Sequence, residues 1–133
     1  MTSDLTRLVE KIRAALPGVI AVYVFGSQAA GIAGQESDID LAVLHDSPIS
    51  QVACWDLAQE LAREAGRDVD LVDLRAASTV MRAQVIAKGQ RLFCADERQC
   101  AEFEDYVYSA YARFNEERRA ILQDIRQRGS VYG

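Results

Sequence analysis

The sequence predicts a mixed α/β fold, a small sheet flanked by helices with a long helix at the C-terminal end. Short runs of β-branched residues alternate with segments whose apolar residues recur at helical spacing. Glycine, proline and serine separate these runs, and the last quarter of the chain follows one helical pattern. Half of the 133 residues are apolar, which is enough for a buried core, so we expect a single domain over residues 1–133.

The first part of the chain predicts a helix and two strands. Residues 3–16 carry an apolar stripe, with Ser3 as a candidate N-cap. The run VIAVYVF, residues 19–25, is almost wholly apolar and predicts a strand buried on both faces. Residues 28–37 lack periodicity and predict a loop, after which DIDLAVL, residues 38–44, predicts a second strand.

The second part of the chain predicts alternating helices and strands, followed by one long helix. We expect a helix from about residue 50 to 65, a third strand over residues 67–74 and a shorter helix over residues 78–88. The segment QRLFC, residues 90–94, is a candidate edge strand. A long helix is predicted over about residues 97–128.

Composition excludes several classes of protein. The net charge of −5 argues against direct nucleic-acid binding, and no apolar run is long enough for a membrane anchor or signal peptide. The three cysteines form no C-x-x-C pair and are odd in number, which favours reduced thiols over a disulfide framework or a zinc site. We therefore expect a cytoplasmic protein.

Two aspartates stand at the open end of the second predicted strand. Asp38 and Asp40 alternate with Ile39, so both project from one face, with Cα atoms about 6.5–7 Å apart. Two carboxylates in a partly dry cleft repel each other unless a cation lies between them. Carboxylate oxygens are hard ligands that suit Mg²⁺ or Mn²⁺ better than zinc.

A third carboxylate is available on the next predicted strand. Asp68 and Asp70 share a face with Val72 and Leu74, again with acids first and apolar residues after them. Asp70 is the preferred candidate because Asp68 lies nearer the turn at Gly66. A solvated strand end is the alternative interpretation for both, and the choice between Asp68 and Asp70 stays open.

Gly26 and Ser27 follow the first predicted strand and form the other half of a candidate site. Glycine lets backbone N–H groups approach a phosphate closely, and a serine can hold phosphate oxygens through its hydroxyl and amide. The segment matches neither the P-loop nor the G-x-G-x-x-G pattern. A Gly-Ser pair by itself would usually be a simple turn.

The spacing Gly-Ser, ten residues, Asp-x-Asp resembles the signature of the minimal nucleotidyltransferases of the polymerase β superfamily. The resemblance runs along nearly the whole chain and is greatest to the single-domain antitoxins encoded beside HEPN-domain toxins. It implies that Gly26 and Ser27 hold the triphosphate of ATP. It also implies that Asp38 and Asp40 bind two Mg²⁺ ions with Asp70 as the third acid. The chain departs from many relatives at residues 28–30, where they carry arginines.

The resemblance also implies a reaction and a partner. An antitoxin of this kind transfers AMP from ATP to a tyrosine hydroxyl of its cognate HEPN RNase toxin, in a complex with that toxin. Two other functions stay open: stoichiometric capture of the toxin without catalysis, and nucleotidyl transfer to a small molecule. The chain is short for enclosing a small acceptor, which favours a macromolecular one.

The long C-terminal helix is the candidate docking element. Its candidate anchors for the toxin are aromatic: Tyr106, Tyr108, Tyr111 and Phe114. Packing against the chain's own sheet is the alternative for those on the inward side. We expect Trp55 to serve packing, and His45, the only histidine, to lie in a loop or at the surface.

Overall fold

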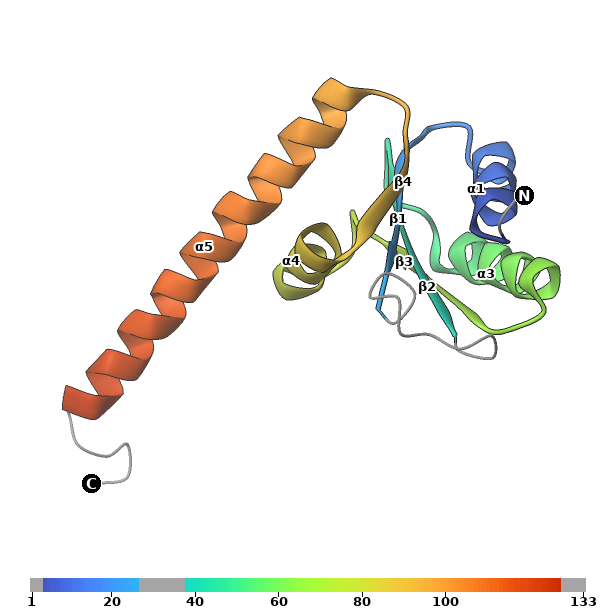
Figure 1. The fold of residues 1–133 in the computed structure, drawn as a ribbon. Helices are drawn as coiled ribbons and strands as arrows, with labels where there is room; N and C mark the ends of the chain where they lie inside the picture. The colour runs from blue at the N-terminus through green and yellow to red at the C-terminus, as the bar shows by residue number, and fades with distance from the viewer. Residues whose placement is uncertain (1–3, 27–37, 128–133) are drawn as a thin grey trace.

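The computed structural model describes residues 4–26 and 38–127 and confirms the mixed α/β class (Figure 1). Ser3 and the predicted loop over residues 28–37 lie outside the described residues. The elements are α1 Asp4–Ala15, β1 Val19–Phe25, β2 Ile39–His45, α3 Gln51–Ala65, β3 Val69–Asp73, α4 Thr79–Lys88, β4 Gln90–Cys94 and α5 Glu97–Gln127. None of the described helices is long and apolar enough to cross a bilayer.

The four strands form one mixed sheet in the order β3-β2-β1-β4. Strand β1 pairs antiparallel with β2 and with β4, while β2 and β3 are parallel. The parallel pair needs a crossover, which α3 supplies. Segment 90–94, predicted as an edge strand, is β4 and lies at one edge of the sheet, with β3 at the other.

Each face of the sheet has its own core. One face packs against α1 and α3 through a cluster that includes Val22, Leu41 and Val43. The other packs against α4 and α5 through a cluster that includes Tyr23, Ala42 and Leu44. Figure 1 shows the two helical layers on opposite sides of the strands. Strands covered on both faces must be apolar throughout, which is why β1 and β2 appear in the sequence as nearly continuous apolar runs.

Local capping fixes the helix ends close to where the sequence places them. The Ser50 hydroxyl accepts a hydrogen bond from the Ala53 N–H at 3.1 Å, and helix α3 ends at Gly66 with φ of 72°. Ser78 caps α4 in the same way, through the N–H of Met81 at 3.1 Å. Asp96, which sequence analysis did not single out, accepts from the first turn of α5.

Two side chains have positions that the sequence pattern did not predict. Trp55 was expected to pack, but it lies on the outer side of α3 with 64% of its surface exposed, so that prediction is wrong. Asp73, the last residue of β3, is a buried acid for which the sequence offered no role. Its carboxylate accepts hydrogen bonds from the N–H groups of Ile49 at 2.9 Å and Arg75 at 3.0 Å, and so ties the loop before α3 to the end of β3.

We predict that Asp73→Ala lowers the free energy of unfolding by roughly 2–3 kcal/mol, because two partly buried N–H donors lose a charged acceptor. Urea denaturation followed by circular dichroism measures the change. Asp68→Ala is the matched control, since Asp68 is exposed and should stay within about 0.5 kcal/mol of wild type. Equal stabilities for the two variants would contradict the structural role of Asp73.

Candidate functional site

The candidate acids gather at one end of the sheet because of strand register. Asp40 pairs directly with Asp70 in the parallel β2–β3 ladder. Since paired residues of neighbouring strands share a face, both carboxylates emerge on the face that carries Ala42 and Leu44, the side of α4 and α5. Asp38 lies one residue before β2 and is exposed. The structure therefore brings Asp40 and Asp70 together, with Asp38 two residues along the chain.

Asp68 lies one residue before β3 and does not share this pairing. It is exposed, and its carbonyl accepts a hydrogen bond from the N–H of Ile39 at 3.0 Å, which extends the β2–β3 ladder. The direct partner of Asp40 is Asp70. This geometry favours Asp70 as the third acid.

Gly26 lies against Asp40 because β1 and β2 are antiparallel. Phe25, the last residue of β1, pairs with Asp40, so the next residue reaches the side of the Asp40 carboxylate. Gly26 has φ of 69°, and a Cβ atom built on it would collide with Oδ2 of Asp40. Only glycine meets both constraints without strain. Ser27, its predicted partner in phosphate binding, lies outside the described residues.

The acids perturb one another. Partial burial raises the pKa of Asp40 above its ordinary value, the negative charge of Asp70 and a hydrogen-bonding contact with it raise it further, and Asp38 adds to the effect. A carboxylate in this position gains from any cation that neutralises the group. The cluster is thus electrostatically suited to bind a positive ion and poorly suited to stand without one.

The donor chemistry fits a hard divalent cation, since the candidate ligands are all carboxylate oxygens. In the described part of the chain no three acidic, histidine or cysteine side chains lie close enough to hold an ion as they stand. Asp38 and Asp70 are both exposed, whereas Asp40 is half-buried. The fit therefore rests on the type of donor atom and on the direct pairing of Asp40 with Asp70.

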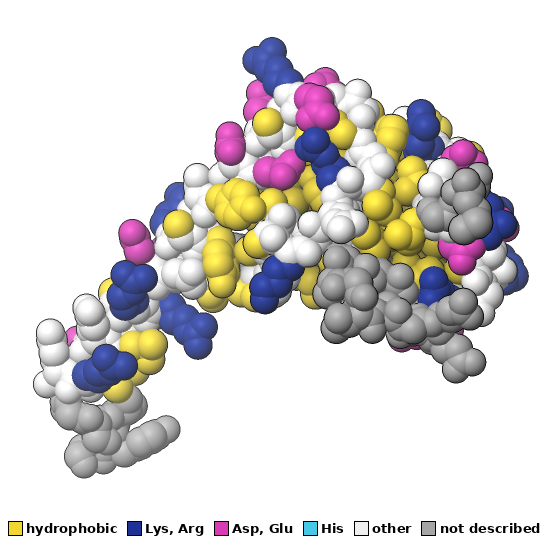
Figure 2. All heavy atoms as spheres, in the orientation of Figure 1, with side chains coloured by type: hydrophobic (Ala, Val, Ile, Leu, Met, Phe, Trp, Pro, Cys, Tyr) yellow, Lys and Arg dark blue, Asp and Glu magenta, His cyan; other side chains and the backbone are white. Residues whose placement is uncertain are grey.

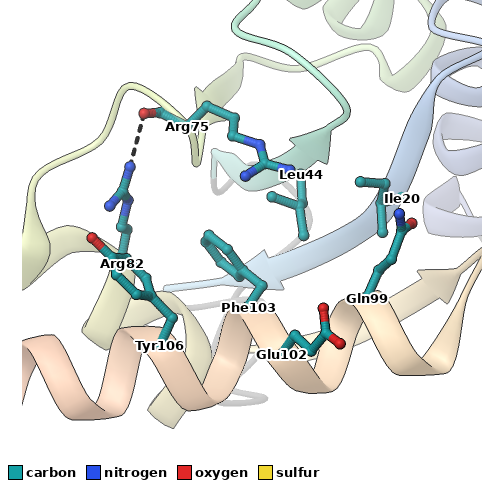
Figure 3. A pocket seen from close by; sticks show the side chains of 8 residues that line it. All are labelled: Ile20, Leu44, Arg75, Arg82, Gln99, Glu102, Phe103 and Tyr106. Carbon is teal, nitrogen blue, oxygen red and sulfur yellow. Dashed lines mark hydrogen bonds between the residues drawn. The ribbon is translucent and has the colours of Figure 1, made fainter.

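A cavity of about 530 Å³ lies on the same sheet face but contains none of the predicted site residues. It is lined by residues of β1, β2 and α5 and by Arg75 and Arg82, as Figure 3 shows. Arg82 donates to the carbonyl oxygens of Leu74 at 2.7 Å and Arg75 at 2.8 Å, and Arg75 donates to that of His45 at 2.8 Å. These arginines hold the chain that follows β3, so we assign the chemistry to the acids and not to this cavity.

A second cavity, of about 350 Å³, lies at the β3 edge and includes Asp70 among its lining residues. Trp55 and Cys54 of α3 line it as well. This cavity lies on the α3 side of the sheet, opposite to the face on which the Asp40 and Asp70 carboxylates emerge. The exposure of Trp55 and its position at this cavity depend on the tertiary structure and could not be predicted from the sequence.

His45 ends β2, at the opposite end of that strand from Asp40. Its Nδ1 is 2.9 Å from Oδ1 of Asp46 and accepts from the Ser47 N–H at 3.3 Å. It is thus part of the strand and half-buried, where a loop or surface position was expected, and it takes no part in the acid cluster.

Strands β1, β2 and β3 bring Gly26 and the candidate acids to one end of a mixed sheet, and this arrangement defines the class as a nucleotidyltransferase. The family model described as polymerase beta, nucleotidyltransferase matches residues 8–98, and the chain belongs to that family. It is 38% identical over 119 residues to the protein adenylyltransferase MntA of Shewanella oneidensis, covering 90% of this chain and 85% of that protein.

Two solved structures share the fold over nearly the whole chain. A toxin–antitoxin complex with AMP-PNP aligns at a TM-score of 0.83 and 36% identity, covering 93% of this chain and 98% of that one. The MNT antitoxin bound to tri-AMPylated HEPN toxin of Shewanella oneidensis aligns at 0.78 and 35% identity, covering 92% and 95%. This chain is therefore a homologue of MntA antitoxins, as the motif spacing indicated.

We predict that Gly26→Ala reduces nucleotidyl transfer by at least about tenfold, because the added methyl group displaces the Asp40 carboxylate. Initial rates of pyrophosphate release measure the effect. Gly66→Ala is the matched control: Gly66 also has a positive φ, of 72°, but a Cβ there meets nothing within 4 Å. Equal losses in the two variants would mean that backbone strain, and not contact with Asp40, is responsible.

Proposed function

We propose that this chain is an antitoxin that transfers AMP from ATP to a tyrosine hydroxyl of a cognate HEPN toxin and so neutralises it. The observation that carries the proposal is the register of the β2–β3 ladder, which places Asp40 against Asp70 with Gly26 beside them. The support from relatives is specific, since one is named a protein adenylyltransferase and another is bound to tri-AMPylated HEPN toxin.

In the proposed reaction the tyrosine oxygen attacks the α-phosphorus of ATP. The bond from that phosphorus to the bridging oxygen breaks, pyrophosphate leaves, and the hydroxyl proton passes to solvent. Mg²⁺ held by Asp38, Asp40 and Asp70, with two ions expected, would neutralise the charge that develops on the phosphates and activate the hydroxyl. Gly26 leaves room for the Asp40 carboxylate, and Ser27 is the proposed contact of the triphosphate.

The first test mixes the purified chain with ATP, Mg²⁺ and the HEPN protein encoded beside it. The intact mass of the toxin should rise by whole AMP units, and EDTA should prevent the rise. We predict that Asp40→Asn lowers the rate by at least about 10³-fold, because a metal ligand and its charge are lost together. If the intact mass of the toxin does not change in the presence of a folded wild-type chain that binds ATP, the proposal is overturned.

Folding of the Asp40→Asn variant is the necessary control. Because repulsion from Asp70 and burial disfavour the charged Asp40, removing that charge should leave the metal-free protein at least as stable as wild type. If the variant still protects cells from the toxin at normal expression, the result favours stoichiometric capture of the toxin, because protection then does not need catalysis. Transfer to a free small alcohol but not to the toxin would favour the small-molecule alternative.

Helix α5 is the proposed docking element for the toxin. Its 31 residues span about 46 Å, and Figure 1 shows its C-terminal half projecting away from the sheet. In its first half Cys100, Phe103 and Val107 are buried against the sheet. The apolar stripe continues onto the projecting half, where Ile121 is 61% exposed and Leu122 is 46% exposed.

Some of the aromatic candidates on α5 pack against the chain's own sheet, and others are exposed and available for docking to the toxin. Tyr111 packs against the second core, whereas Tyr106, Tyr108 and Phe114 are exposed. Phe114 stacks on Tyr111 with ring centroids 6.5 Å apart. In Figure 2, yellow side chains show on the surface of the projecting helix and where it meets the body. A shallow apolar groove bounded by Phe114, Ile121 and Leu122 is therefore the proposed contact.

We predict that the double variant Ile121→Ser, Leu122→Ser weakens binding of the HEPN toxin by at least about tenfold without lowering the melting temperature, since both side chains are exposed. Isothermal titration calorimetry measures the affinity. Val52→Ser is the control, since Val52 is 71% exposed on α3, which packs on the opposite face of the sheet from α5. An unchanged affinity in the double variant would place the contact elsewhere.

A further inference from the structure

Two of the three cysteines meet at the junction between β4 and α5. Cys94 is the last residue of β4 and Cys100 lies in the first turn of α5, with five residues between them. Their Sγ atoms are 2.9 Å apart. Both cysteines are free, and the third, Cys54, lies on α3 with its Sγ donating to the carbonyl of Leu71 at 3.5 Å.

The backbone on both sides of the pair is held in place. Cys94 pairs with Ala21 in the β1–β4 ladder, and the next N–H, of Ala95, donates to the Ile20 carbonyl at 2.7 Å. The N–H of Cys100 donates to the Asp96 carbonyl at 3.0 Å, inside the first turn of α5. The sheet and the helix thus bring the two sulfur atoms together without a covalent bond.

The two thiols differ in access to solvent. Cys94 is half-buried, whereas Cys100 is fully buried in the second core, with its Sγ 3.8 Å from the Ile20 carbonyl oxygen. Burial and the hydrogen bond shared with Cys94 raise the pKa of Cys100 to about 12, so it remains a protonated thiol at neutral pH. An oxidant in solution therefore reaches Cys94 first.

We propose that Cys94 and Cys100 are a redox-modification site, which a hydroperoxide converts into a reversible disulfide. A disulfide has an S–S bond of about 2.05 Å, so the sulfur atoms need to approach by only about 0.9 Å. The site lies apart from the acid cluster, and it does not rest on the proposed function.

The chemistry balances with the hydroperoxide as the oxidant. The Cys94 sulfur attacks the peroxide, the O–O bond breaks, and Cys94 becomes a sulfenic acid while water or an alcohol leaves. The Cys100 sulfur then attacks the Cys94 sulfur, and the hydroxyl group departs as water with the proton of Cys100. Two thiol hydrogens are lost in total, and the peroxide is reduced.

The disulfide would fix the N-terminal end of helix α5, called its base below. At present this base is held by ion pairs of Arg91 with Glu97 at 2.9 Å and Glu104 at 3.1 Å, and by the Tyr23 hydroxyl, which donates to Glu104 at 3.4 Å. None of these contacts is covalent. Oxidation would thus fasten the long helix covalently to strand β4.

The test treats the full chain with hydrogen peroxide and measures its intact mass. The expected product has lost two hydrogens and regains them with dithiothreitol. Trypsin cleaves after Arg98, between the two cysteines, so non-reducing digestion should yield the peptides LFCADER and QCAEFEDYVYSAYAR joined by one disulfide. Formation of the short loop should also raise the melting temperature by about 5 °C.

Cys54→Ser is the matched control and should form the crosslink at the wild-type rate. Cys94→Ser and Cys100→Ala should both abolish it, and Cys94 is exposed enough that its variant is expected to fold. A crosslink that contains Cys54, or oxidation of Cys94 to sulfinic acid without loss of two hydrogens, would overturn the proposal. A melting temperature that does not change on forming the Cys94–Cys100 bond would overturn its role at the base of α5.

Discussion

The pairing of β2 with both of its neighbours is the constraint on which the rest of the structure depends. Antiparallel pairing with β1 sets Asp40 opposite Phe25 and therefore next to Gly26. Parallel pairing with β3 sets the same residue opposite Asp70. A shift of either register by one residue would turn Asp40 into the core and break the site and both hydrophobic clusters at once. The same hydrogen bonds that stabilise the sheet thus align the acids.

The site is an unfavourable arrangement that the sheet maintains. Burial and the negative charge of Asp70 disfavour the ionised form of Asp40. Strands covered by helices on both faces supply the rigidity that keeps such groups together. Function and stability conflict at this point, as is common where ionisable groups are preorganised.

Helix α5 combines two roles along one stripe of side chains. Its first half completes the second core, so the helix cannot leave the sheet without exposing Phe103 and Val107. Its second half keeps the apolar spacing but has no sheet beneath it. The apolar stripe of α5 is buried in the first half of the helix and exposed in the second half. A partner that covers the exposed half is the best explanation for this pattern. Relatives with 35–36% sequence identity have been solved in toxin–antitoxin complexes.

The sequence by itself determined the element order, the helix ends at Ser50, Gly66 and Ser78, and the motif that identifies the family, because period and capping are local properties. Only the tertiary structure decided which strands are neighbours, since register depends on contacts between distant residues. It therefore selected Asp70 over Asp68 as the neighbour of Asp40, buried Asp73, exposed Trp55 and brought Cys94 against Cys100. Each of these outcomes depends on which residues lie across a strand or beneath a helix. The spacing of residues within one segment of the chain does not determine those neighbours.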